Sequence, residues 1–184
     1  MKKRIVMLSL LVLSLMPSAS SSRTEPGKAI TGVDKPQAQH LNTEFREIRR
    51  ELSQVREDLR TLSSSMTAHE SVQSHLIRLS SENIRSMEGI CRYMETMTGR
   101  LSLVEEDRLF YYCNSQKYSA EQMKNRTNEY LNNIKEMRGE MLITAASPLI
   151  DAAAQKILSS SSLIDEVAKM LDQCSSEEKP PSHH

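Results

Sequence analysis

A continuous heptad register from Leu41 to Val104 constrains the fold of this chain more than any single motif. Apolar residues fill most a and d positions of this register, although only 38% of all residues in the chain are hydrophobic. No proline lies between Pro36 and Pro148, so the backbone chemistry permits a long helix in this region. A helix with such an apolar seam is stable only when other helices cover it. The pattern therefore predicts an all-α protein.

Capping signals and changes of register predict where the helices begin and end. We expect one long N-terminal coiled-coil helix over residues 37–112, because no strong stop signal interrupts the register. A capping box predicts a second helix over 119–146, and a Ser-Pro pair suits the start of a third helix over 148–174. These lengths predict that the long helix folds back into a three-helix bundle and that residues 41–66 project from it as a stalk.

Gly99 offers an alternative to the unbroken long helix. The segment Ser102 to Glu105 reads as a further capping box, so a helix could end at Gly99 and restart at Ser102. If the helix continues without a break, Gly99 lies at an f position, away from the apolar seam.

The two ends of the chain predict export and flexible extensions. Residues 1–20 combine a basic start, an apolar segment at 5–16 and small residues after it, which is the pattern of a signal peptide. An uncleaved anchor or a buried N-terminal helix is the alternative. Residues 21–36 and 175–184 lack periodicity and are rich in Ser, Pro and charged residues, so we expect a flexible linker and a disordered tail. The expected location is periplasmic or secreted.

The charges that flank the first part of the seam predict a parallel homo-oligomer. In a parallel coiled coil each g residue faces the following e residue of a neighbour, which pairs Glu44 with Arg49 and Glu51 with Arg56. The alternative is that these charges only solvate a helix that packs inside its own chain. The predicted oligomer interface comprises Leu41, Phe45, Ile48, Leu52, Val55, Leu59, Leu62, Met66, Glu44, Arg49, Glu51 and Arg56.

The three cysteines are expected to form one disulfide. If the helices fold back as predicted, Cys113 and Cys174 lie at the same end of the bundle, whereas Cys91 lies several turns away. Export favours a Cys113–Cys174 disulfide, and Cys91 is then free or joined to its copy in a parallel oligomer. The alternative is three buried, reduced cysteines in a protein that is not exported.

No sequence motif indicates catalysis, and we expect neither enzymatic activity nor a cofactor or metal. The spacings Met94/Met97 and Met137/Met141 would suit Cu(I), but these residues fall on core positions, so packing explains them. Removal of the predicted signal peptide takes away three of the 24 basic residues and leaves 21 against 24 acidic residues, a mildly acidic balance that argues against nucleic-acid binding.

Most of the aromatic residues cluster around the predicted turn at 113–118. Phe110, Tyr111, Tyr112 and Tyr118 would lie together at the tip of the bundle. They are expected to form either a partner-binding patch or a small cap that closes the end of the core.

These features together favour an exported, non-catalytic coiled-coil protein with a structural or assembly role in the cell envelope. A periplasmic component of a secretion, conjugation or pilus apparatus fits this description. Its expected partners are further copies of itself and other envelope proteins, with no transmembrane segment in the mature chain. The alternatives are a periplasmic binding module, either a chaperone or a soft-metal binder, and a secreted effector.

Overall fold

The first helix begins with an aspartate as its N-cap and a proline in its first turn. The computed structural model describes residues 33–66 and 71–176, and its first helix, α1, spans Lys35–Ser64. The Asp34 side chain accepts a hydrogen bond from the backbone N–H of Gln37 at 3.2 Å. Pro36 lies in the first turn, where its missing N–H leaves no helical hydrogen bond unmade. The sequence therefore sets the start of α1 by local chemistry.

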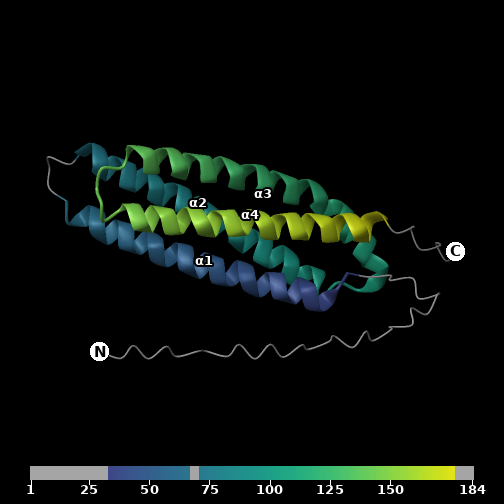
Figure 1. Cartoon of the computed structure of the whole chain (residues 1–184). Helices are drawn as coiled ribbons and strands as arrows, with labels where there is room; N and C mark the ends of the chain where they lie inside the picture. Colours follow the sequence, from purple (N-terminus) through teal and green to yellow (C-terminus); the bar gives the residue numbers. More distant parts are fainter. Residues whose placement is uncertain (1–32, 67–70, 177–184) are drawn as a thin grey trace, which may run out of the picture. The chain divides into compact units, whose positions relative to one another are not determined.

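Three further helices follow α1, namely α2 at Ser71–Leu101, α3 at Glu106–Glu140 and α4 at Ser147–Ser176. All regular secondary structure within the described residues is helical, which confirms the predicted all-α class. Helices α1 and α3 each pack against both α2 and α4, and consecutive helices run antiparallel (Figure 1). The described part of the chain is thus an up-down-up-down four-helix bundle.

The predicted single helix over residues 37–112 is wrong, because the chain turns back twice within it. The first break follows a run of serines at the end of α1. Ser64 and Ser65 donate hydroxyl hydrogen bonds to the carbonyls of Thr61 and Leu62, at 2.8 and 2.7 Å. Such local bonds compete with the helical ladder, so this segment leaves the helix although it contains no proline or glycine.

The second break lies close to Gly99, where the alternative prediction places the end of a helix. Helix α2 ends at Leu101 and α3 begins at Glu106, slightly later than the predicted restart at Ser102. The Ser102 hydroxyl donates to the Gly99 carbonyl at 2.8 Å, and the next two backbone N–H groups donate to the Arg100 carbonyl at 2.9 and 3.0 Å. These bonds close a tight turn between α2 and α3.

The predicted bounds of the second helix are also wrong, because α3 begins before the predicted turn at 113–118 and ends at Glu140 instead of 146. Leu109, Cys113 and Ala120 share the buried face of α3, so the helical period continues through that segment. The polar residues of this segment lie on the outer side of the helix and do not form the predicted turn.

The remaining predicted segments fall partly outside the described residues. The predicted third helix, 148–174, corresponds to α4, which extends slightly beyond it at both ends. The predicted signal peptide at 1–20 lies outside the described residues. The last residues of the predicted linker at 21–36 form the cap and first turn of α1, and the first two residues of the predicted tail at 175–184 belong to α4.

The predicted stalk is wrong, because the chain's own helices cover the seam of α1. The structure buries Leu41, Phe45, Ile48, Leu52 and Leu59 and packs the partly buried Val55, Leu62 and Met66 against the same core. A residue buried inside one chain cannot also form the seam of a parallel coiled coil in the same fold. The assignment of these residues to an oligomer interface is therefore corrected.

The charged residues of that predicted interface also find their partners inside the chain. Arginines of α1 reach α2, and a glutamate of α1 reaches α4. Arg49 pairs with Glu95 at 3.1 Å, Arg56 with Glu88 at 2.6 Å and Glu51 with Lys156 at 2.6 Å. Glu44 lies 3.9 Å from His40 of the same helix. The alternative that these charges flank a helix packed in its own chain is the one that the structure adopts.

Small polar side chains occur in the core without leaving unpaired atoms. Ser80, Thr98, Thr127 and Ser160 are fully buried, and each donates to the carbonyl one turn earlier in its own helix, at 2.8 to 3.0 Å. Among the described residues no buried side-chain nitrogen or oxygen lacks a hydrogen-bond partner. The core is thus apolar packing with internally satisfied hydroxyl groups.

The burial of α1 predicts that two leucines in the middle of helices contribute very differently to the free energy of unfolding. Leu52 has no exposed surface, whereas Leu158 on α4 is 58% exposed. We expect Leu52→Ala to lower the free energy of unfolding by about 2–5 kcal/mol, and Leu158→Ala by about 0.5 kcal/mol or less, because only the first leaves a cavity. Urea unfolding of both variants measures this. Equal losses would contradict the burial of the α1 seam within the chain.

Candidate functional site: a basic groove between α1 and α2

An open groove lies between the last turns of α1 and the first turns of α2, with a volume of about 620 Å³. Its lining residues are Arg56, Arg60, Ser63 and Ser64 from α1, and Ser74, His75, Ile77, Arg78, Ser81, Glu82 and Arg85 from α2. Four arginines and one glutamate line the groove, so its charge is positive. It is the best candidate for a binding site among the described residues.

An ion-pair ladder joins α1 to α2 next to this groove. Arg49 of α1 pairs with Glu95 of α2 at 3.1 Å. Seven residues further along α1, Arg56 pairs with Glu88 at 2.6 Å, and Glu88 lies seven residues before Glu95. The ladder therefore repeats with the heptad period of the two antiparallel helices.

The groove opens where this ladder stops. One heptad nearer the α1–α2 connection, the next positions hold Ser63 on α1 and Ser81 on α2. The Ser63 hydroxyl is 3.2 Å from that of Ser74, so these short side chains contact each other across the helix pair. Serines are too short to fill the space that arginine and glutamate occupy in the ladder. A polar hollow with hydroxyl donors is the result.

The arginines of the groove differ in how their charge is matched. The side-chain hydrogen bond to Glu88 raises the pKa of Arg56, so that charge is already compensated. Arg60 lies 3.7 Å from Glu57, and both of these side chains are mostly exposed. Solvent screening makes such a surface pair weak, which leaves Arg60 available to another anion.

The α2 side of the groove adds two further guanidinium groups. Arg78 donates a hydrogen bond to Nδ1 of His75 at 3.2 Å, a contact that supplies no carboxylate to match the arginine charge. Arg85 makes no ion pair within the described part of the chain. A planar guanidinium with several donors binds phosphate or carboxylate oxygens in pairs, and nearby serine hydroxyls can add donors. This arrangement suits a multi-oxygen anion.

The groove was not predicted from the sequence, because the charges that flank the seam in α1 were not compared with those in α2. The site could have been predicted by aligning two antiparallel heptad series. These are Arg49, Arg56 and Ser63 in α1, and Glu95, Glu88 and Ser81 in α2.

The predicted aromatic patch is not a single cluster. Phe110 and Tyr111 form an edge-to-face ring contact with centroids 5.5 Å apart. Tyr112 is half-buried and donates its hydroxyl hydrogen to the Met97 carbonyl at 3.1 Å, and burial raises its pKa. Tyr111 and Tyr118 are exposed and lie two helical turns apart on α3. Because residues 113–118 are helical, these rings spread along α3 and do not surround a turn.

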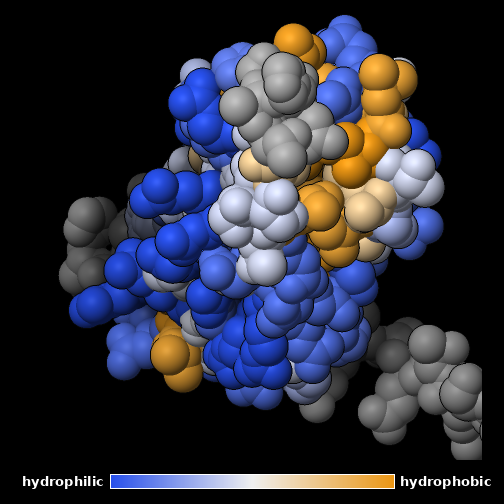
Figure 2. Space-filling view, turned by 90° about the vertical axis from the view of Figure 1, so that its left-hand side faces the viewer, coloured by the Kyte–Doolittle hydropathy of each residue, from blue (hydrophilic) through white to orange (hydrophobic). Residues whose placement is uncertain are grey.

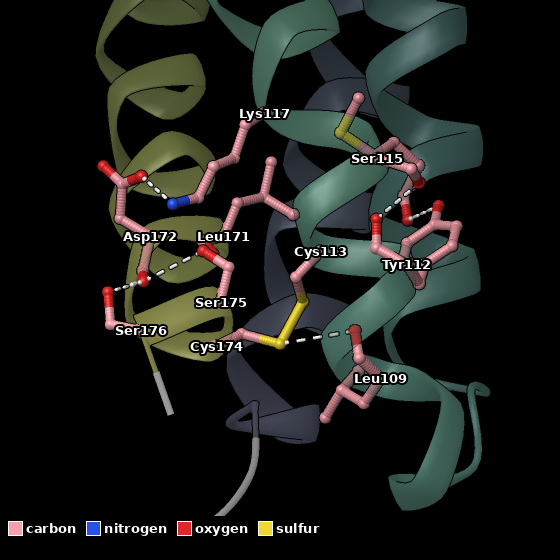
Figure 3. Close-up of a disulfide and its surroundings, with 11 residues drawn as sticks. Leu109, Tyr112, Cys113, Ser115, Lys117, Leu171, Asp172, Cys174, Ser175 and Ser176 are labelled. Carbon is pink, nitrogen blue, oxygen red and sulfur yellow. Dashed lines mark hydrogen bonds and ion pairs between the residues drawn. A yellow bond between two sulfur atoms is a disulfide. The ribbon is translucent and has the colours of Figure 1, made fainter. Parts of the chain in front are cut away.

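The predicted cysteine pair is present in the structure. Cys113 of α3 and Cys174 of α4 form a disulfide with Cα atoms 6.1 Å apart, within the usual range for such bridges (Figure 3). The neighbouring Lys117–Asp172 ion pair at 3.0 Å joins the same two helices. The disulfide therefore links the start of the α3–α4 hairpin to its end.

The methionines considered as soft-metal ligands lie in the core. Met94, Met97, Met137 and Met141 are all buried among apolar side chains. Within the described residues no group of three or more His, Cys, Asp or Glu side chains is placed to hold a metal ion.

Comparisons with known proteins do not extend this description. No protein-family model matches the chain, and neither curated proteins nor solved structures give a significant match.

The buried Cys91 predicts a pH-dependent stability. It has no exposed surface and lies 3.5 Å from the Ser160 hydroxyl, and burial raises the pKa of its thiol from 9.0 to about 11. The unfolded chain releases this proton at lower pH than the folded chain, so stability falls as pH rises from 9 to 11. We expect a loss of about 2–3 kcal/mol from this group in urea unfolding at pH 8 and pH 11.

The matched control for this measurement is Cys91→Ala. Lysine and tyrosine groups titrate in both proteins, so the difference between the two pH dependences reports Cys91 alone. Identical pH dependences would show that the thiol is not buried as described.

Proposed function

We propose that this protein is an exported, non-catalytic helical bundle that serves the cell envelope as a binding or assembly component. The observation that carries the proposal is the disulfide between Cys113 and Cys174. Disulfides persist in oxidising compartments such as the periplasm or the extracellular space, and they are rare as structural bonds in the cytosol. A small bundle gains most from such a bond outside the cell.

The N-terminal sequence supports the same location. Residues 2–4 are basic and residues 5–16 are apolar, as in an export signal, although they lie outside the described residues. No helix within the described ranges is long and apolar enough to cross a membrane. The predicted export signal and the Cys113–Cys174 disulfide support this location independently, because they lie in different parts of the chain.

The fold changes the kind of assembly role that we propose. The α1 seam is covered by α2 and α4, so assembly would use the outer surfaces of the bundle and not an exposed coiled-coil stalk. A periplasmic part of a secretion, conjugation or pilus apparatus remains the specific form of this proposal. The second candidate, a binding module, is favoured by the open basic groove between α1 and α2.

The location and the disulfide can be tested together in cells that produce the full chain. We expect the protein in the periplasmic or secreted fraction, with one thiol that is accessible to alkylation only after denaturation. A soluble cytosolic protein with three free thiols would contradict the proposal.

Single cysteine variants test which residues form the bond. We expect Cys113→Ser and Cys174→Ser each to abolish the mobility shift on non-reducing gels, while the matched control Cys91→Ser keeps it. Loss of a bond that closes a loop of 61 residues should lower the free energy of unfolding by about 4 kcal/mol in the loop-entropy model. An unchanged stability after reduction would contradict a structural role for the bond.

A further inference from the structure

The basic groove lies at the same end of the bundle as a group of exposed aliphatic side chains. Val72, in the first turn of α2, is 70% exposed, and Leu142, in the connection between α3 and α4, is 83% exposed. Figure 2 looks at this end and shows hydrophobic residues gathered on one side, with hydrophilic residues over most of the remainder. A face on which exposed hydrophobic residues gather beside polar ones is typical of a contact surface.

Hydrogen bonds of Gln73 hold Leu142 next to the first turn of α2, which carries Val72. The Gln73 side chain donates to the Glu140 carbonyl at 3.3 Å and accepts from the Leu142 backbone N–H at 2.8 Å. It therefore fixes the start of the α3–α4 connection against the first turn of α2. The next two residues, Ser74 and His75, already line the groove. Val72 and His75 lie three residues apart and share one side of α2, so Val72 borders the groove, and Gln73 holds Leu142 against the same turn.

We propose that this end of the bundle binds the surface of an anionic phospholipid bilayer. The guanidinium groups of Arg60, Arg78 and Arg85 contact the phosphodiester groups, while Val72 and Leu142 enter the interface between headgroups and acyl chains. Basic side chains near an anionic bilayer and aliphatic side chains that enter its interface are two separate attractions, and peripheral proteins combine them because either alone binds weakly.

Charge and apolar exposure together favour a lipid over a free phosphate compound. A soluble phosphate compound would need the arginines and serines of the groove but would leave Val72 and Leu142 in contact with water. A bilayer uses both parts of the surface. This inference deepens the proposed envelope role, since it names a membrane surface as the partner.

Sedimentation of the purified full chain with vesicles tests the proposal. We expect binding to vesicles of phosphatidylcholine and phosphatidylglycerol, and much weaker binding to phosphatidylcholine alone. The double variant Arg60→Gln/Arg78→Gln should lose affinity by roughly 30-fold, because each arginine near an anionic surface raises the affinity about fivefold. The matched control Arg92→Gln/Arg126→Gln removes the same charge from exposed sites elsewhere and should lose less than about threefold.

A second pair of variants tests the apolar part. Val72→Ser/Leu142→Ser should weaken vesicle binding roughly tenfold or more, whereas Leu103→Ser/Leu158→Ser, at other exposed positions, should leave it nearly unchanged. Residues 1–32 are the same in every protein compared, so the ratios of affinity report the bundle surface. Thermal unfolding by circular dichroism verifies that each variant is folded.

Three results would overturn the proposal. They are equal losses for the groove and control arginine pairs, equal binding to neutral and anionic vesicles, and binding of inorganic phosphate or pyrophosphate in calorimetry without any binding to vesicles. The last result would assign the groove to a soluble phosphate compound. None of these results bears on export, which the location and thiol measurements in cells test separately.

Discussion

The burial of the α1 seam inside its own chain is the interaction on which the rest of the structure depends. Leu41, Phe45, Leu52 and Leu59 have no exposed surface, so α1 is stable only while α2 and α4 lie against it. Isolated helices of this length gain little from intrinsic propensity, and tertiary packing of an apolar face supplies most of their stability. The seam thus determines the antiparallel arrangement of α1 with both neighbours, and with it the positions of the groove and the connections.

The flanking charges show why pairing rules between helices do not identify the partner helix. Glu51 and Arg56 satisfy the expectation for a parallel neighbour, yet in the structure they pair with Lys156 and Glu88 of the same chain. Opposite charges at the edges of a seam exclude some arrangements by repulsion, but they do not distinguish a second copy from another segment of the same chain. Helix pairing within one chain does not depend on protein concentration, and in this chain α2 and α4 cover the seam of α1.

The sequence predicted those parts of the fold that depend on local patterns. The helical class follows from periodicity, the approximate extent of α4 from Ser147-Pro148, and the cysteine pair from the end of the bundle at which Cys113 and Cys174 lie. The break after Ser64 could not be predicted in the same way, because a few serine hydroxyl groups act there without a proline or glycine signal. The groove was not predicted because it forms where serines replace the arginine and glutamate of the ion-pair ladder between α1 and α2. This replacement is visible only when the two helices are aligned.

The third cysteine makes the order of folding and oxidation matter. Cys91 is closer to Cys113 along the chain than Cys174 is, and a shorter loop closes at lower entropic cost in an unfolded chain. Oxidation before folding therefore favours the wrong bridge, Cys91–Cys113. Folding reverses this preference, since it buries Cys91 beside Ser160 and brings Cys174 to Cys113. A chain that enters an oxidising compartment must therefore form its core before its thiols react, or depend on thiol–disulfide exchange to correct the pairing.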